Sequence, residues 1–316
     1  MLREGLIYLS ENAVARRFAT GAPGARTMAR RFVAGETVED GVRAARELNR
    51  AGLSVSLDYL GESVSRREDA TAAADTYLRM IDRIVEEKLD ANVSLKLTQM
   101  GQDIDESFLR ENVGRVLDRA RDADMFVRLD MESSSYTQRT IDFFRRLWDE
   151  GYHNVGIVLQ SYMYRSADDV TLANALGARV RLCKGAYKEE EQYAFQPKDE
   201  VDANYVAQTK VLLSDGVYTG VATHDEAMID AARRHAAEHT IPLSGWEFQM
   251  LYGIRRDLQQ QLLAQGYNLR VYVPFGEAWY PYLMRRMAER PANLLFIVNS
   301  VLRESPLGFM FGRKRR

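Results

Sequence analysis

The chain has 316 residues, of which 46% are hydrophobic and 28% are charged, and its net charge is −2. Such a chain can bury a large core, and its near-neutral charge gives no indication of a nucleic-acid partner. Cys183 is the only cysteine, which excludes an intrachain disulfide framework and is typical of a reducing compartment. The sequence has no apolar run long enough to span a membrane, and its N-terminus carries too many charges for a secretory signal. We therefore expect a cytoplasmic protein.

The predicted elements begin with helices and then alternate. Residues 1–50 have helical periodicity, and Thr37 with Asp40 resembles a capping box in its acidic form. Short β-like runs then occupy residues 53–60, 92–98, 125–131, 154–160, 179–185, 218–224, 246–251 and 269–276. Helical stretches separate them, for example at residues 68–89, 105–123 and 137–151. A last helix is expected from Trp279, with Pro281 in its first turn and Pro291 as its stop.

Eight strands that alternate with helices predict a parallel α/β fold. No linker rich in proline, glycine or serine divides the chain, so the pattern is continuous. The count of eight favours a closed (β/α)8 TIM-like barrel with extra N-terminal helices over an open doubly wound sheet. An open sheet would usually show a glycine fingerprint, and neither G-x-G-x-x-G nor a Walker A motif is present. The predicted organisation is an N-terminal helical segment (1–50), the barrel (51–303) and a flexible basic tail (304–316) that ends in GRKRR.

Polar residues recur where the predicted strands end. They are Asp58, Lys96, Thr98, Gln99, Asp130, Glu132, Gln160, Arg165, Arg181, Lys184, Thr223, His224, Glu247, Gln249 and Tyr272. In such barrels the active site lies at this end of the strands, so the set predicts a site. Single members have structural alternatives: Lys96 with Asp130 as an ion pair, and Gln160 as a core amide bonded to backbone. A capping or core role is the alternative for His224, and Cys183 is expected to be a packing residue.

The charges of the set indicate an anionic ligand. Lys96, Arg181 and Lys184 are joined by Arg285 and Arg286 of the last helix, and cations of this kind bind carboxylates or phosphates. Tyr282, Arg285, Arg286 and Glu289 fall on one helical face by their spacing, although an exposed ion-pair face remains the alternative. The glycine in KGAY (184–187) would let backbone amides approach a pyrophosphate. No histidine spacing supports a metal site.

Seven motifs in order resemble the FAD-dependent proline dehydrogenases, and most closely their monofunctional bacterial type. They read VSLKLTQMG, RLDMES, VLQSY, RLCKGAYKE, ATHD, EFQMLYG and RVYVPFGEAWYPYLMRRMAERPAN, and the match extends from about residue 50 to residue 300. The resemblance implies a (β/α)8 barrel that oxidises L-proline to Δ1-pyrroline-5-carboxylate. It implies FAD as the cofactor and a membrane quinone as the electron acceptor, with a peripheral contact at the inner membrane surface. A pyrroline-5-carboxylate dehydrogenase is a candidate partner.

The resemblance also implies a substrate site. Arg285 and Arg286 would hold the proline carboxylate with help from Lys96. Asp130 would pair with Lys96 or Arg286, and Glu289 would steady an arginine.

Two tyrosines and a set of cofactor contacts complete the implied site. Tyr272 and Tyr282 would pack against the proline ring. The implied FAD contacts are Gln160, Arg181, Lys184, Gly185, Ala186, Thr223 and His224. Lys188 stands where some relatives carry an aromatic residue that stacks on adenine.

Two other functions are compatible with the residues alone. A Schiff-base aldolase would use Lys96 or Lys184 as its nucleophile. A non-catalytic barrel would bind a carboxylate ligand without turnover.

Overall fold

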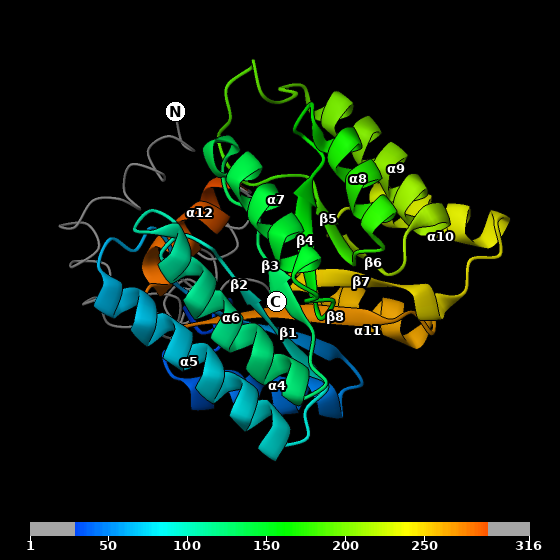
Figure 1. Ribbon diagram of the computed structural model, residues 1–316. Coiled ribbons are helices and arrows are strands. Elements are labelled where there is room, and N and C mark those ends of the chain that lie inside the picture. The colour runs from blue at the N-terminus through cyan, green and yellow to red at the C-terminus, as the bar shows by residue number, and fades with distance from the viewer. Residues whose placement is uncertain (1–28, 290–316) are drawn as a thin grey trace, which may run out of the picture.

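Eight parallel strands close into a barrel that helices surround (Figure 1). The computed structural model describes residues 29–289, and the side chains of residues 29–284. Neighbouring strands follow chain order from β1 to β8, and β8 pairs with β1 to close the ring. This confirms the (β/α)8 barrel that the alternating pattern predicted.

The strands are β1 (Ser54–Tyr59), β2 (Ala91–Leu95), β3 (Val127–Leu129), β4 (Val155–Gln160), β5 (Val180–Cys183), β6 (Thr219–Ala222), β7 (Trp246–Leu251) and β8 (Leu269–Phe275). The helices are α4 (Val38–Arg50), α5 (Arg67–Glu86), α6 (Glu106–Asp122), α7 (Ser134–Asp149), α8 (Ser166–Leu176), α9 (Lys198–Asp215), α10 (Glu226–Glu238), α11 (Arg256–Ala264) and α12 (Trp279–Glu289). A 3-10 turn, η1 (Leu243–Gly245), precedes β7.

Several predicted strands extended too far at their carboxyl ends. The run predicted at 92–98 ends as β2 at Leu95, and the run predicted at 125–131 ends as β3 at Leu129. After β2 the chain turns at once, because the amide of Gln99 bonds to the carbonyl of Lys96 at 3.2 Å. The polar residues at the predicted strand ends therefore lie partly on strands and partly on the loops that follow them.

Helix α4 begins at the predicted capping box. The hydroxyl oxygen of Thr37 accepts from the amide of Asp40 at 3.2 Å, and the carboxylate of Asp40 accepts from the amide of Thr37 at 3.1 Å. These reciprocal bonds satisfy two amides that the helix itself leaves unpaired. The helix predicted within residues 1–28, the stop at Pro291 and the tail 304–316 lie outside the described residues.

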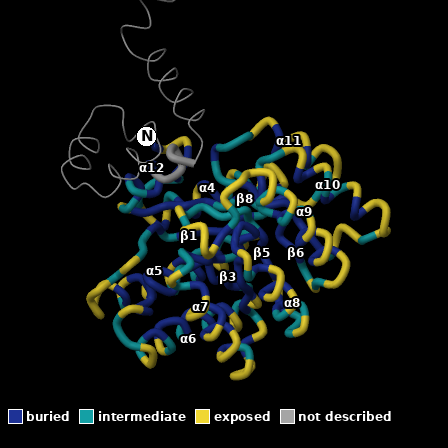
Figure 2. Tube along the Cα trace, turned by 90° about the horizontal axis from the view of Figure 1, so that it is seen from above, coloured by how far each residue is buried: buried dark blue, intermediate teal, exposed yellow. Residues whose placement is uncertain are grey.

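The barrel interior carries polar side chains. Successive residues of a strand face opposite sides of the sheet, so one face packs against the helices and the other faces the interior. Apolar residues such as Val55, Leu57 and Val93 are fully buried in the large cluster that includes the surrounding helices. Their neighbours Ser56 and Ser94 are also fully buried, but they belong to the other face. Figure 2 shows the buried strands at the centre and exposed residues on the outer helices and loops. Interiors of this fold are usually filled by branched apolar side chains. A polar interior has to be held together by hydrogen bonds instead.

The chain enters the last described helix through Gly276. Its φ of 132° lies in the region that favours glycine, and its amide donates to the carbonyl of Gly35 at 2.9 Å. Helix α12 then buries Leu283 in a second apolar cluster with Phe32 and Leu60. This packing fixes the first turns of α12 beside the carboxyl ends of the strands.

Candidate active site

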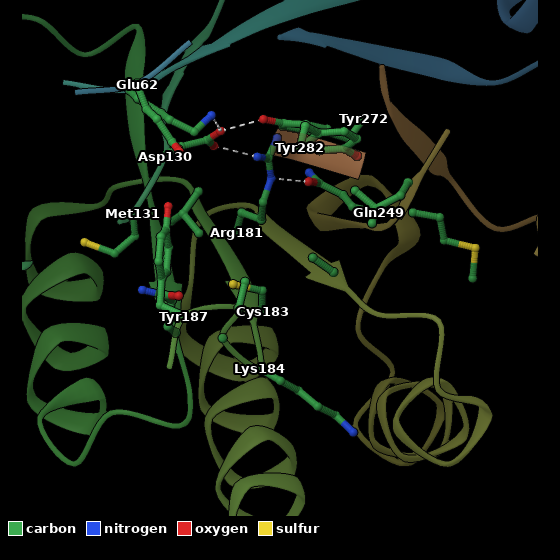
Figure 3. Close-up of a pocket in the computed structure, with 18 of the residues that line it drawn as sticks. Glu62, Asp130, Met131, Arg181, Cys183, Lys184, Tyr187, Gln249, Tyr272 and Tyr282 are labelled. Atoms are coloured by element: carbon green, nitrogen blue, oxygen red, sulfur yellow. Dashed lines mark hydrogen bonds and ion pairs between the residues drawn. The ribbon is translucent and has the colours of Figure 1, made fainter. Parts of the chain in front are cut away.

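A cavity of about 700 Å³ lies at the carboxyl ends of the strands. Eleven of the predicted site residues line it: Lys96, Asp130, Gln160, Arg181, Lys184, Gly185, Ala186, Thr223, His224, Tyr272 and Tyr282. Figure 3 shows how several of them meet. The other three, Arg285, Arg286 and Glu289, belong to α12, and their side chains lie outside the described residues. The structure therefore brings together every implied substrate or cofactor contact whose side chain it describes. Six members of the strand-end polar set do not line the cavity: Asp58, Thr98, Gln99, Glu132, Arg165 and Glu247.

Asp130 is the centre of the polar network in this cavity (Figure 3). Its carboxylate accepts from the hydroxyl of Ser94 at 2.6 Å, from Arg181 at 2.9 Å and from the phenol of Tyr272 at 2.8 Å. Burial alone would raise the pKa of Asp130, but the charges of Arg181 and Lys96 outweigh it and hold the pKa below its ordinary value. Asp130 is therefore an ionised group that fixes its three neighbours.

Lys96 lies between two carboxylates. Its ammonium nitrogen is 3.5 Å from Asp58 and 3.7 Å from Asp130. Burial alone would lower the pKa of Lys96, but these two carboxylates raise it well above its ordinary value. The ion pair that the structural alternative requires is thus present, and both Lys96 and Asp130 also line the cavity. A lysine held protonated in this way is a poor nucleophile for a Schiff base.

Arg181 is buried in the barrel and is fixed on several sides. Its guanidinium donates to one amide, one carboxylate and two hydroxyl groups, which belong to Gln249, Asp130, Ser94 and Ser56. Its central carbon lies 5.1 Å from the centre of the Tyr272 ring, which adds a cation–π contact. The charge is therefore held in one place at the cavity wall.

Gln160 combines the structural and the functional interpretations. Its side-chain amide donates to the backbone carbonyl of Glu132 at 2.8 Å, as expected for a core amide, yet the residue also lines the cavity. The carboxyl group of Glu132 accepts from the hydroxyl of Thr98 at 2.8 Å. Burial raises the pKa of Glu132 to about 7, against the opposing charge of Lys96. The loop after β3 therefore carries one ionised carboxylate and one that titrates near neutrality.

Lys184 faces a different part of the site from Lys96. Its ammonium group pairs with Asp202 and lies 2.8 Å from Asp225. In Figure 3 its side chain extends away from Arg181. The predicted cations thus belong to two separate regions of one cavity.

Backbone geometry shapes the wall near Lys184. Gly185 has a φ of 125°, and a Cβ added there would lie 2.4 Å from the ring of Tyr162, so this position requires glycine.

The ring of His224 accepts from the amide of Leu251 at 2.9 Å through Nε2. A neutral His224 must then carry its proton on Nδ1, and its other edge is a donor. Within residues 29–284, no group of three His, Cys, Asp or Glu residues is placed to hold a metal ion.

Some residues of the cavity wall were not assigned to the site from the sequence. Examples are Glu62, Met131, Tyr187 and Ile254. Cys183 packs against the core, as expected, and also lines the cavity. Tyr187 belongs to the KGAY motif and could have been included on that ground. Glu62 and Ile254 lie on loops outside the predicted strand runs, where neither periodicity nor strand position gives a signal. Met131 ends the predicted run 125–131, but an apolar side chain there gives no chemical signal.

Comparison with known proteins identifies the family. Residues 42–299 match the proline dehydrogenase family. Proline dehydrogenase 1 of Bacillus subtilis subsp. natto is 42% identical and covers 96% of this chain and 100% of its own length. Proline dehydrogenase of Deinococcus radiodurans is 42% identical over 87% of this chain and 90% of its own.

A solved structure supports the same fold. The crystal structure of proline utilization A from Bdellovibrio bacteriovorus inactivated by N-propargylglycine superposes with a TM-score of 0.81 at 24% identity. The match covers 97% of this chain and 38% of that longer chain. The family match over most of the chain, the long alignments with curated relatives and the cavity geometry lead to one conclusion: the chain belongs to the proline dehydrogenase family.

Proposed function

We propose that the chain oxidises L-proline to Δ1-pyrroline-5-carboxylate with a bound FAD, and that a quinone receives the electrons. The observation that carries this proposal is the cavity at the strand ends, where the network of Asp130, Lys96, Arg181 and Tyr272 meets. Family membership supports the reaction class. The overall change removes two electrons and two protons from proline, so an electron acceptor is required.

The residues present fit a flavin dinucleotide. The wall combines a side-chain amide, two cationic side chains and a glycine backbone, on Gln160, Arg181, Lys184 and Gly185. Pyrophosphates bind where backbone amides and cations converge, and ring systems bind against fixed charges and amides. We propose that these residues hold FAD together with Ala186, Thr223 and His224. When bound, the flavin supplies the two-electron acceptor for the oxidation.

The substrate region is assigned to the opposite part of the cavity. Lys96 stays protonated between its carboxylates, so it offers a permanent positive charge to a substrate carboxylate. Tyr272 is fixed by its bond to Asp130, and Tyr282 supplies a second aromatic wall. We propose that these side chains orient proline, and that Arg285, Arg286 and Glu289 complete the site from α12. Catalysis would then come mainly from positioning.

The electron acceptor is proposed to be a membrane quinone. No helix among the described residues is both long and apolar enough to cross a bilayer. We propose a peripheral contact with the inner membrane surface through the basic tail, because each basic residue near anionic lipid contributes about 1 kcal/mol. A pyrroline-5-carboxylate dehydrogenase is the proposed consumer of the product.

A spectrum and a turnover assay test the function. The purified protein should show a flavin absorption spectrum that bleaches when L-proline is added without oxygen, and it should reduce an artificial acceptor in proline-dependent turnover. FAD should be released on denaturation. Protein that gains neither spectrum nor turnover with added FAD would contradict the proposal, and borohydride trapping of a carbonyl substrate would favour the aldolase.

Replacing either Arg285 or Arg286 of α12 by a neutral residue should weaken proline binding without removing the cofactor. Arg285→Met or Arg286→Met should lower kcat/KM for proline about 10- to 150-fold, because one charge-assisted contact of about 1.5–3 kcal/mol is lost. Lysine at either position should rescue only in part, since it lacks the planar fork. Flavin content and kcat/KM are the measurements.

A matched control is Arg139→Met on α7, which removes a surface ion pair with Asp103 outside the cavity. It should leave kcat/KM unchanged. Wild-type kinetics in both α12 variants would contradict a carboxylate clamp and favour an exposed ion-pair face.

A further inference from the structure

We propose that Gln249 is a positioning residue that fixes the guanidinium of Arg181, and that Glu247 and Gly220 fix Gln249 in turn. The four residues lie on three adjacent strands: Arg181 on β5, Gly220 on β6, and Glu247 and Gln249 on β7. The inference rests on the proposed function in one respect, since its test reads the state of the bound flavin.

The orientation of the Gln249 amide is determined by its two neighbours. Its oxygen accepts from Nε of Arg181, and its nitrogen donates to the carboxylate of Glu247 at 2.7 Å (Figure 3 shows the first contact). A flipped amide would point a donor at the guanidinium and an acceptor at the carboxylate. Because both contacts would then be repulsive, only one orientation is stable.

Glu247 is a reliable anchor because it is itself fixed and ionised. It is 3% exposed, and it accepts from Arg270 at 2.8 Å and from the phenol of Tyr218 at 2.9 Å. Burial alone would raise the pKa of Glu247, but Arg270 outweighs it and holds the pKa below its ordinary value. The acceptor that orients Gln249 is therefore present throughout the neutral pH range.

Gly220 leaves the space beside β6 that the side-chain amide of Gln249 occupies. A Cβ at this position would stand 2.5 Å from the amide nitrogen of Gln249 and 2.8 Å from its amide carbon. A flexible side chain could usually move aside, but Gln249 is bonded at both ends of its amide. Any side chain at position 220 would therefore displace the amide from Arg181 or from Glu247.

The hydrogen bond from Arg181 to Gln249 runs to a different side of the barrel from the other hydrogen bonds of the guanidinium. The remaining acceptors, Ser56, Ser94 and Asp130, belong to β1, β2 and the end of β3, whereas Gln249 belongs to β7. Without Gln249, the contacts described for the guanidinium would pull it toward one side of the barrel. The two-sided arrangement is what locates the positive charge at the cavity wall, where a fixed charge favours the reduced, anionic form of a bound flavin.

Removing the amide should change electron transfer more than substrate affinity. We expect Gln249→Met, which keeps the side-chain volume, to lower kcat about tenfold while KM for proline changes less than about twofold. The equilibrium between reduced and oxidised cofactor should shift about tenfold toward the oxidised form, which is about 30 mV for a two-electron couple. Gly220→Ala should move kcat and the potential in the same direction, because it displaces the same amide.

The control is Gln208→Met on α9. Gln208 is 3% exposed and donates to Ser166 at 2.6 Å, so it is an equally buried amide, but it does not line the cavity. This variant should lose some thermal stability and keep the wild-type potential and kcat. The inference is overturned if Gln249→Met keeps both values, whatever its stability, or if Gln208→Met shifts them equally.

The test separates this inference from the proposed function. Wild-type protein without a flavin spectrum or proline turnover would overturn the proposed function and, with it, the role assigned to Gln249. An active wild type with an unchanged Gln249→Met potential and kcat would overturn the positioning role alone. If Gly220→Ala does not fold, Gln249→Met decides the outcome by itself.

Discussion

Asp130→Asn is expected to lower the free energy of unfolding by about 3–5 kcal/mol, because it removes one partner of a buried ion pair and leaves the other charged. The carboxylate holds Arg181 at 2.9 Å and Lys96 at 3.7 Å, and Asp58 would remain as the nearest described anion to Lys96. The asparagine amide keeps only one acceptor oxygen, so its NH2 group must face either the phenol of Tyr272 or the guanidinium of Arg181, and both of these now donate to Asp130. The measurement is urea unfolding of the holoenzyme at pH 7.

Activity should fall with stability in this variant, and the two losses can be separated. The guanidinium of Arg181 and the ring of Tyr272 both lose the acceptor that orients them. We expect kcat/KM to fall at least 100-fold at a temperature where the variant remains folded. Kinetics should therefore be measured well below the unfolding midpoint of the variant.

Asp169→Asn is the matched control for the loss of stability. Asp169 is also largely buried and accepts two bonds from Arg165, at 2.9 and 3.0 Å, but Arg165 is partly exposed and neither residue lines the cavity. Loss of this pair should cost about 1 kcal/mol or less, since water can solvate the remaining arginine. Equal stability losses at the two aspartates would contradict the central role of Asp130.

A double-mutant cycle gives the sharper result. Arg181→Met alone should also be strongly destabilising, because it removes the buried cation that pairs with Asp130 and the donor to the amide oxygen of Gln249. In the double variant Asp130→Asn/Arg181→Met the loss should be clearly smaller than the sum of the two single losses. Additive losses would show that the two side chains act independently.

Most of the barrel could be predicted because its signal is local. Runs such as residues 154–160 are apolar, lie at regular spacing and alternate with amphipathic helices. The eight predicted strands were confirmed, and errors were confined to their ends, where turns such as that after Lys96 depend on contacts that the sequence does not reveal. The capping box of Thr37 and Asp40 was also confirmed, since it depends on residues only three positions apart.

The candidate site was predictable in membership but not in arrangement. A strand-end rule suffices to collect Lys96, Asp130 and Arg181, because a parallel barrel brings the same ends of all strands together. It does not say that Ser56 and Ser94 bond to Arg181, since a serine in a strand is an unremarkable residue until the barrel closes. Pairings across the barrel are fixed by three-dimensional register.

The two buried glutamates illustrate the same limit. Glu247 lies in the predicted run 246–251 and Glu132 directly follows the run 125–131, and nothing in the sequence shows that their ionisation differs. In the structure Arg270 holds the pKa of Glu247 below its ordinary value, whereas burial raises the pKa of Glu132. Their opposite states follow from whether a cation lies within direct bonding distance, which only the fold decides.

Glu132 should make the protein less stable as the pH rises through neutrality. Burial raises its pKa from 4.5 to about 7, so the folded protein binds this proton more tightly than the unfolded chain does. The resulting stabilisation is fully present below pH 4.5 and is lost as the pH rises through 7. Each unit of difference is worth about 1.4 kcal/mol, so the loss amounts to about 3 kcal/mol across this range.

Glu132→Gln isolates this contribution, because glutamine is neutral and can still accept a bond from the hydroxyl of Thr98. Between pH 5 and pH 8 the wild type should lose about 2 to 3 kcal/mol more unfolding free energy than the variant. Other titrating groups cancel in that difference, and Glu150→Gln, at an exposed ion pair with Arg110, should keep the wild-type profile. Parallel profiles for the wild type and Glu132→Gln would mean that Glu132 is already ionised at pH 5. The charge of Lys96 would then have to offset the effect of burial on the pKa of Glu132 fully.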